Sequence, residues 1–459
     1  MSSGLDVARP RGGRARAAQD LAGFVTDALA RPGREGRLRA LVLPLPGPLS
    51  SGALLRALRG VDAWHLRSRA ARLELLGLGA TARIAPAGED RFAVVQRESA
   101  RWLEELSVAH HPDAPRLPLR AFVGFAFAPG ASGAEPWEPF GDALAVLPRW
   151  TLIQPEAERG ALVLAVAGRQ SAELALAELH ELLAAQRPAE APSGPRLALE
   201  HEAKGRYEAR VHDALAAIAR GRLEKVVVSR RATVSGDTDL DPVAVLDRLE
   251  GNAGPESTTY FVRRAGSVLL GVTPERLLAV RGTSLETEAL AGTAREPSAL
   301  SRSDKDRAEH GFVIDSIRGA LAPFTQGLSV ASSPEITPAG AVHHLRTRIS
   351  ASLRPGTHPL EVAAALHPTS AVAGTPRRPA SDWIARHEPA RGWYAGLVGS
   401  VDQHAGAELA VALRGGVIRG ARAWAFSGGG IVKASEPAAE HEETALKMSG
   451  FLRALGVPA

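Results

Sequence analysis

The chain has 459 residues, with 55 Lys and Arg against 50 Asp and Glu, a net charge of +5 and no Cys. The absence of Cys excludes disulfide frameworks, thiolate zinc sites and cysteine nucleophiles. The pI of about 9.9 is weak evidence for a polyanionic partner, because it comes from Arg on a small net charge. Apolar residues make up 45% of the chain, yet no apolar stretch reaches the roughly 20 residues of a membrane helix. We therefore expect a globular, cytoplasmic protein that binds neither nucleic acid nor a membrane.

The first half of the chain begins with an Arg-, Ala- and Gly-rich segment at 1–30, which we expect to be a disordered tail. Residues 31–200 alternate short apolar runs with Ala-, Leu- and Glu-rich segments, as expected for the N-terminal part of an α+β domain. The periodicity predicts strands at 38–45, 122–127 and 144–153, and helices at 51–59 and 172–186. A Pro-rich stretch at 187–196 is either a linker or a loop inside one domain.

The second half, 201–459, carries runs of short strands and a few long helices. The predicted helices are 203–220, 303–321, 359–366 and 437–455. The predicted strands are 225–229, 258–263, 268–272, 277–281, 393–401, 409–414 and 422–426. Short turns between successive strands favour a mixed, mainly antiparallel α+β core.

Two of these helices carry glutamates on one side. Glu309 shares a helical stripe with Val313 and Ile317, so it should face the core, where an unpaired carboxylate would be costly. Glu440 and Glu443 lie three residues apart on the last long helix. Carboxylates from two helices are what a hard cation such as Mg²⁺ uses, although solvated faces with ordinary salt bridges would show the same spacing.

Lys225 and Glu275 are candidates for acid and base chemistry. Lys225 leads into the apolar run 226–228 and either extends its ammonium to solvent or lies in a cleft, where a desolvated lysine can act as a base. Glu275 lies in a turn between two apolar runs. It is either a surface charge or, against apolar walls, an acid with a raised pKa that can donate a proton.

The scarcity of lysine adds weight to the second half. The chain has 50 Arg and only five Lys, and all five Lys follow residue 200: Lys204, Lys225, Lys305, Lys433 and Lys447. Arg keeps its proton at any relevant pH, whereas Lys can lose one. The placement of lysine therefore points to 201–459 as the catalytic region.

Glycine-rich segments at 289–293 and 427–432 would allow a ligand to approach the backbone closely and offer it amide donors. Neither segment fits a Walker or dinucleotide-binding loop. His367, before Pro368, and Arg414, at the end of a predicted strand, complete the set of polar candidates. Each of these signals is weak on its own.

Together, the motifs resemble the chorismate-utilising enzymes, a family that includes isochorismate, salicylate, anthranilate and aminodeoxychorismate synthases. The resemblance covers about 203–456 and rests on ten motifs in the family's order. They lie at 225–229, 271–277, 287–293, 305–310, 344–345, 366–369, 374–376, 391–396, 428–432 and 435–443. The resemblance implies a single large α+β domain, in which two mainly antiparallel sheets are stacked and surrounded by helices.

The residues of the motifs are most similar to those of isochorismate synthases. Members that add ammonia lack a lysine base at the position of Lys225, and aminodeoxychorismate synthases often have a nucleophilic lysine where this chain has Ala291. The two residues together imply that water is the nucleophile. The resemblance therefore implies Mg²⁺-dependent isomerisation of chorismate to isochorismate, for menaquinone or a catecholate siderophore. Salicylate synthase, which goes on to eliminate pyruvate, is the nearest alternative.

The resemblance also implies a role for each candidate residue. Lys225 would activate water for attack at C2, and Glu275 would protonate the departing C4 hydroxyl. Mg²⁺ would be held by Glu309, Glu440 and Glu443. The substrate would be contacted by Ala291, Gly292, Thr293, His367, Tyr394, Arg414, Gly428, Gly429 and Lys447.

Two other classes of function are disfavoured. A nucleic-acid-binding protein should interleave Arg clusters with aromatics, but aromatics are only 5% of this chain and the Arg are spread among acids. A catalytically dead homologue should lack part of the implied active-site set, and every member is present. No exposed apolar helix stripe is left unassigned, so we expect a monomer.

Overall fold

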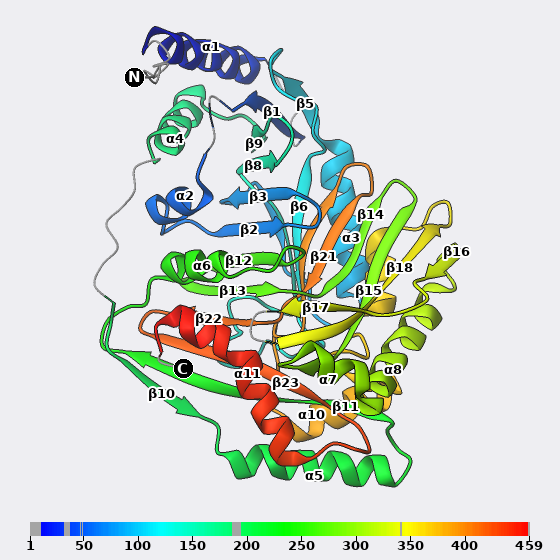
Figure 1. Cartoon of the computed structure of the whole chain (residues 1–459). Coiled ribbons are helices and arrows are strands. Elements are labelled where there is room, and N and C mark those ends of the chain that lie inside the picture. The colour runs from blue at the N-terminus through cyan, green and yellow to red at the C-terminus, as the bar shows by residue number, and fades with distance from the viewer. Residues whose placement is uncertain are drawn as a thin grey trace, which may run out of the picture.

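The computed structural model describes residues 11–31, 37–45, 47, 49–185, 194–339 and 342–457, apart from the side chains of 11–18 and 301. Two large β-sheets form its centre, with helices packed around them (Figure 1). The helices are α1 (Arg11–Ala30), α2 (Ser51–Ala57), α3 (Arg91–Glu105), α4 (Ala172–Ala184), α5 (Lys204–Ala219), α6 (Pro242–Gly251), α7 (Pro297–Arg302), α8 (Asp304–Leu321), α9 (Pro359–Leu366), α10 (Arg377–His387) and α11 (Pro437–Leu455).

The larger sheet has 13 strands within the described residues, and all its pairs are antiparallel except β1 with β5. In order across the sheet they are β10 (Leu197–His201), β11 (Lys225–Gly236), β23 (Arg422–Ile431), β22 (Gly415–Arg419), β13 (Ser267–Thr273), β12 (Thr258–Arg264), β2 (Ala63–Ser68), β3 (Leu73–Leu78), β8 (Trp150–Pro155), β9 (Ala161–Ala167), β1 (Leu38–Pro44) and β5 (Ser107–His110), with β19 (Gly374–Thr375) paired to β11.

The smaller sheet has 10 strands in the same described part of the chain, and its pairs are antiparallel. Their order is β16 (Thr325–Val330), β18 (Val342–Leu353), β15 (Ser284–Ala294), β14 (Arg276–Arg281), β21 (Ala407–Val411), β20 (Leu397–Asp402), β6 (Arg120–Phe125), β7 (Ala143–Leu147) and β4 (Ala82–Ile84), with β17 (Glu335–Ala339) paired to β18.

Both sheets take strands from both halves of the chain. In the larger sheet β12 pairs with β2, and in the smaller sheet β20 pairs with β6. The segments 31–200 and 201–459 are therefore parts of one α+β unit, as the sequence predicted. Of the Pro-rich stretch, 187–193 lies outside the described residues.

The core follows from the alternation of side chains along the strands. In β1, Ala40 and Val42 join a large apolar cluster shared by both sheets, whereas Leu41 and Leu43 join a second cluster beneath helices such as α4 and α6. The two sheets meet face to face: the ring of Trp64 in β2 lies 5.9 Å from that of Phe122 in β6. This packing confirms the two stacked sheets.

The N-terminal segment differs from the predicted disordered tail over residues 11–30, whereas residues 1–10 of that prediction lie outside the described residues. Residues 11–30 form α1, and its Leu21, Val25 and Leu29 are buried. Their spacing of four residues makes an apolar stripe, which packs beside α4 and β1 at the top of Figure 1. The Arg- and Ala-rich composition hid this stripe. No helix in the described ranges is long and apolar enough to cross a membrane.

The predicted strand at 144–153 is two strands in different sheets. β7 ends at Leu147 in the smaller sheet, and β8 begins at Trp150 in the larger one. Pro148 lies between them and has no N–H to donate to a ladder, so the chain leaves one sheet there and enters the other.

Candidate active site

A narrow cavity of about 70 Å³ lies between elements of the two sheets. Its walls come from β11 and β23 of the larger sheet, from β15 and β18 of the smaller one, and from helices α8 and α11. Nine of the predicted site residues line it: Glu275, Ala291, Gly292, Thr293, Glu309, Tyr394, Arg414, Gly428 and Lys447. Residues up to 172 positions apart in the chain, Glu275 and Lys447, are thus brought to one place.

Lys225 lies immediately behind this wall. It is the first residue of β11, its side chain is fully buried, and its Nζ lies 3.0 Å from Glu309 Oε1. The alternative that its ammonium extends to solvent is therefore wrong. Because its partner Glu309 lines the cavity, Lys225 is close enough to take part in a reaction there.

Glycines of β23 make room for this ion pair. A Cβ on Gly430 would lie 2.2 Å from Glu309 Oε1 and 3.1 Å from Lys225 Cε, so only glycine fits. Successive residues of a strand face opposite sides, and Gly428 and Gly430 both line the cavity. Gly429, in contrast, faces Glu440 and Tyr207 on the helix side. The predicted pair Gly428 and Gly429 is therefore split between the two faces.

Each of the three predicted metal ligands is paired with a lysine. Besides the Lys225–Glu309 pair, Lys305 Nζ lies 2.6 Å from Glu440 Oε1, and Lys447 Nζ lies 2.5 Å from Glu443 Oε1. Three of the five lysines in the chain thus neutralise three carboxylates on α8 and α11. Glu309 and Glu440 are not solvated surface charges, since their side chains are 12% and 1% exposed.

The carboxylates differ in their electrostatics. Burial would raise the pKa of Glu309, but Lys225, Lys447 and Lys305 together hold that pKa below its ordinary value. Burial and the neighbouring Glu443 raise the pKa of Glu440. One carboxylate of the set is thus firmly charged, while another is held closer to neutrality.

The donor set suits a hard divalent cation, because all three groups are carboxylates and no soft ligand is present. The three glutamates are not drawn tightly together in this arrangement. Among the residues described, only Asp20, His111 and Asp113 form a group of three whose ligand atoms all lie within 4.8 Å of one another. The lysines would have to yield when a cation enters.

Glu275 has the environment of a proton donor. It lies in the turn between β13 and β14 and is 6% exposed. Burial, followed by the nearby Glu288, raises its pKa to about 7, although Lys225 opposes this rise. Thr369 Oγ1 donates a hydrogen bond to Glu275 Oε1 at 3.3 Å. The sequence left a surface charge as the alternative, and burial excludes it.

Cationic and phenolic groups also line the cavity. Lys447 Nζ donates to the carbonyl of Gly428 at 3.2 Å, and Arg414 contacts His344. Burial lowers the pKa of Arg414 to about 10, which leaves the guanidinium charged at neutral pH. Burial also raises the pKa of Tyr394, so its hydroxyl keeps its proton. The cavity therefore contains groups that are suited to bind an anion.

Comparison with known proteins identifies the family. A family model described as chorismate binding enzyme matches residues 47–456. The chain belongs to the chorismate-binding enzymes. The salicylate biosynthesis isochorismate synthase of Pseudomonas aeruginosa is 37% identical over 388 residues, which is 80% of each chain. The isochorismate synthase MenF of Bacillus subtilis is 29% identical over 373 residues, or 77% of each chain.

The fold of this chorismate-binding enzyme also matches solved structures. MenF, the menaquinone-specific isochorismate synthase from Escherichia coli, superposes with a TM-score of 0.78 at 26% identity, covering 96% of this chain and 99% of that one. Anthranilate synthase component I from Streptococcus pneumoniae superposes with a TM-score of 0.66 at 21% identity, covering 83% and 92% respectively. This second likeness concerns the fold alone.

Besides Gly429, another predicted substrate contact of the chorismate-binding enzyme lies away from the cavity. His367 packs between Phe92 and Phe127, and its Nε2 lies 3.3 and 3.2 Å from the carbonyl oxygens of Ala126 and Phe127. Burial lowers its pKa to about 3, so its ring is neutral. His367 therefore fastens the end of α9 to the loop after β6.

Among the residues of the cavity wall to which sequence reasoning gave no role are His344, Ser427 and Gly430. Strand alternation from Gly428 would have pointed to Gly430. His344 lay within a recognised motif but received no role, because its partners Gly292 and Arg414 are 52 and 70 residues away.

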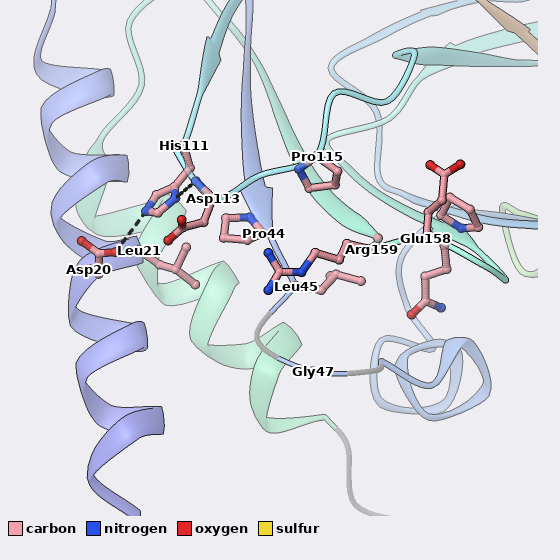
Figure 2. Close-up of a pocket in the computed structure, with 13 residues that line it drawn as sticks. Asp20, Leu21, Pro44, Leu45, Gly47, His111, Asp113, Pro115, Glu158 and Arg159 are labelled. Atoms are coloured by element: carbon pink, nitrogen blue, oxygen red, sulfur yellow. Dashed lines mark hydrogen bonds and ion pairs between the residues drawn. The ribbon is translucent and has the colours of Figure 1, made fainter. Parts of the chain in front are cut away.

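A second cavity of about 590 Å³ lies beside α1 (Figure 2). It is lined by residues of α1, of the segment after β1 and of the loops around β8. None of the predicted catalytic or binding residues lines it. It is therefore separate from the active-site cavity.

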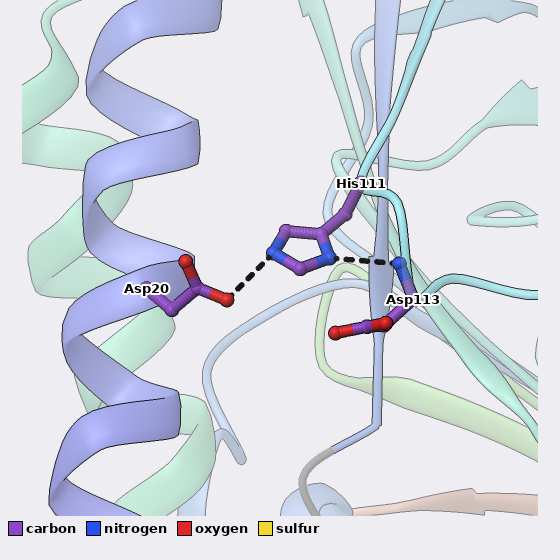
Figure 3. Close-up of side chains that lie close together, drawn as sticks. All are labelled: Asp20, His111 and Asp113. Atoms are coloured by element: carbon purple, nitrogen blue, oxygen red, sulfur yellow. Dashed lines mark hydrogen bonds and ion pairs between the residues drawn. The ribbon is translucent and has the colours of Figure 1, made fainter.

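At the edge of this second cavity, His111 joins α1 to the sheet (Figure 3). Its Nε2 lies 3.2 Å from Asp20 Oδ2, and its Nδ1 accepts a hydrogen bond from the backbone N–H of Asp113 at 3.2 Å. With Nδ1 accepting, the ring proton belongs on Nε2 and is donated to Asp20. A metal bound at Nε2 would require the ring proton to be on Nδ1, where it would face the backbone N–H of Asp113. The arrangement thus favours a link that fastens α1 over a metal site.

Proposed function

We propose that this protein is an isochorismate synthase, which converts chorismate to isochorismate. The observation that carries the proposal is that a buried lysine and a buried glutamate with a pKa of about 7, Lys225 and Glu275, serve one cavity in a chorismate-binding enzyme. Isomerisation needs both a base and an acid at neutral pH. The relatives named above as isochorismate synthases support the choice.

In the proposed reaction, water adds at C2 of the ring, the double bonds shift, and the C4 hydroxyl leaves as water. Lys225 takes a proton from the attacking water. Glu275 gives its proton to the departing hydroxyl. One water enters and one leaves, so substrate and product have the same composition, and the two proton transfers balance.

Glu309 has two partners in this scheme. In the present arrangement its Oε1 lies 3.0 Å from Lys225 Nζ. Its other proposed partner is a bound cation. The proposed ligands of Mg²⁺ are Glu309, Glu440 and Glu443, and the ion would supply positive charge for a substrate carboxylate.

The second carboxylate of chorismate is proposed to contact other groups of the cavity. Arg414, Lys447 and the hydroxyl of Tyr394 lie around the same cavity and provide two cations and a neutral donor. The volume of the cavity, about 70 Å³, is smaller than the roughly 300–1,000 Å³ of typical ligand pockets. Side chains in its wall must therefore move to admit the ring.

The proposal is tested by incubating the pure protein with chorismate and MgCl₂ and separating the products by chromatography. Isochorismate should accumulate, and a chelator should stop the reaction until Mg²⁺ is restored. A coupled assay for pyruvate distinguishes salicylate synthase, which would release pyruvate together with salicylate. The absence of any product from chorismate in the presence of Mg²⁺ would refute both activities.

A further inference from the structure

His344 lies on the cavity wall between two segments that are proposed to contact the substrate. It belongs to β18, is 5% exposed, and has a hydrogen-bond partner at each ring nitrogen. Its Nε2 lies 2.6 Å from Arg414 Nη2, and its Nδ1 lies 2.8 Å from the carbonyl oxygen of Gly292. The hydroxyl of Thr293 lies 3.2 Å from the same Nδ1.

These partners fix the tautomer of the ring. A guanidinium can only donate, so Nε2 must accept from Arg414. A carbonyl can only accept, so Nδ1 must carry the proton and donate it to Gly292. Burial, followed by Arg414 and Lys447, keeps the pKa of His344 well below its ordinary value, so the ring stays neutral. The contacts at both ring nitrogens are thus satisfied by the same neutral tautomer, with the proton on Nδ1.

The backbone is shaped around this ring. In the β15–β18 ladder, Ala291 pairs with Leu345 and Ala294 pairs with His343, so Gly292 and Thr293 together oppose His344 alone. This is a β-bulge, and Gly292 takes the left-handed conformation that bulges often need, with φ of +72°. The bulge turns the carbonyl of Gly292 toward His344 Nδ1. A bulge beside a cavity commonly redirects a side chain or a backbone group.

The conformation of Arg414 has to be held by neighbouring groups. It follows the end of β21 and is a non-glycine residue with φ of +54°, a strained conformation that must be held by its surroundings. The hydrogen bond to His344 Nε2 occupies one N–H of the guanidinium and fixes its orientation. The remaining N–H groups are then available to a ligand in the cavity, which Arg414 lines.

We propose that His344 is a positioning residue, which acts through Arg414 and aims its guanidinium at a carboxylate of the bound substrate. This inference rests on the proposed function, because the substrate is taken to be an anionic ring such as chorismate. His344 does not exchange protons with the substrate, since both of its nitrogens are engaged by protein groups. His344 affects substrate binding by fixing the orientation of one cation, the guanidinium of Arg414.

Two substitutions separate the contact to Arg414 from the contact to the bulge. In His344→Asn, the side-chain amide nitrogen takes the place of Nδ1 and still donates to Gly292, but nothing accepts from Arg414. In His344→Gln, the longer side chain brings its carbonyl oxygen near the position of Nε2, where it accepts from Arg414. A purely structural role at the bulge predicts that the Asn variant is the milder one, and the positioning role predicts the reverse.

The expected result is a split between KM and kcat. Loss of one hydrogen bond that orients a charged group should raise KM for chorismate roughly 10-fold in His344→Asn, with kcat within about 2-fold of wild type. His344→Gln should restore KM to within about 3-fold of wild type. In the Arg414→Lys background, His344→Asn should add no further increase, because the two residues act as one unit. Equal KM values for His344→Asn and wild type would overturn the proposal, as would additive effects in the double variant.

A measurement without substrate keeps this inference separate from the proposed function. Nitrogen-15 NMR of protein with labelled histidine should show His344 protonated at Nδ1 and unprotonated at Nε2. A ring protonated at Nε2 would overturn the hydrogen-bond arrangement whatever the substrate. If wild-type protein failed to convert chorismate, the proposed function would be at fault. If wild type converted it but the Asn variant were the milder of the two, the positioning role would be wrong.

Discussion

Replacing Glu275 with Gln should abolish turnover and, at alkaline pH, stabilise the folded protein. In the folded chain Glu275 has a pKa of about 7 instead of 4.5, because burial and Glu288 disfavour its charge. As pH rises between these values, the unfolded chain releases the proton before the folded chain does, so wild-type stability falls. The difference between the two pKa values corresponds to about 3 kcal/mol, and a Gln at this position avoids the whole of it.

The assay is urea unfolding of both proteins at two pH values. Between about pH 5 and about pH 8.5, the stability advantage of Glu275→Gln should grow by about 2.5 kcal/mol. The control is Glu286→Gln, on the neighbouring strand, where the glutamate side chain is 57% exposed and the stability change should be the same at both pH values. A stability difference for Glu275→Gln that does not change with pH would refute the raised pKa, and with it the assignment of Glu275 as a proton donor.

Three further outcomes are expected. kcat/KM for chorismate should fall as pH rises above about 7, because Glu275 then loses the proton it must donate; a profile without this alkaline limb in wild type would contradict the role. Lys225→Arg keeps a cation but cannot release a proton, so steady-state turnover should vanish while circular dichroism is unchanged; exposed Lys433→Arg is the control and should retain wild-type kcat. Gly430→Ala should lower kcat/KM at least about 100-fold by displacing the ion pair behind it, whereas Gly450→Ala, with no atom within 4 Å of the added Cβ, should have no effect.

Local pattern predicted most of the elements in the second half of the chain. The helix predicted at 359–366 has the same bounds in the structure, and the predicted helices at 303–321 and 437–455 agree to within a residue. Which sheet a strand joins is another matter, because it depends on partners far away in the chain. Pro148 shows this: the sequence on either side of it looks like one strand, yet its two parts pair with β6 and β3 in different sheets.

The candidate site was predictable in part, because residue type and motif order identify groups but not their partners. Spacing on the helix placed Glu309 on a buried side, and its need for a partner was evident from the cost of burying a charge. That the partner is Lys225 depends on α8 packing near β11 and β23. The sequence likewise contains His344 and Arg414, but the hydrogen bond between them exists only because β18 and the end of β21 meet at the cavity.

The scarcity of lysine takes on a more specific meaning in the structure. Lys225, Lys305 and Lys447 each hold one of the three glutamates proposed to bind Mg²⁺. A compact ammonium on a flexible stem can be displaced from a carboxylate more readily than a bidentate guanidinium. We therefore expect arginine at these positions to yield to a cation less readily than lysine.

The most direct test of the account is the product that pure protein forms from chorismate in the presence of Mg²⁺, followed by chromatography with a parallel assay for pyruvate. Wild-type protein should accumulate isochorismate without releasing pyruvate, and Lys225→Arg should form no product. Stoichiometric pyruvate, or a rate in Lys225→Arg that equals the wild-type rate, would contradict the proposed reaction and its base.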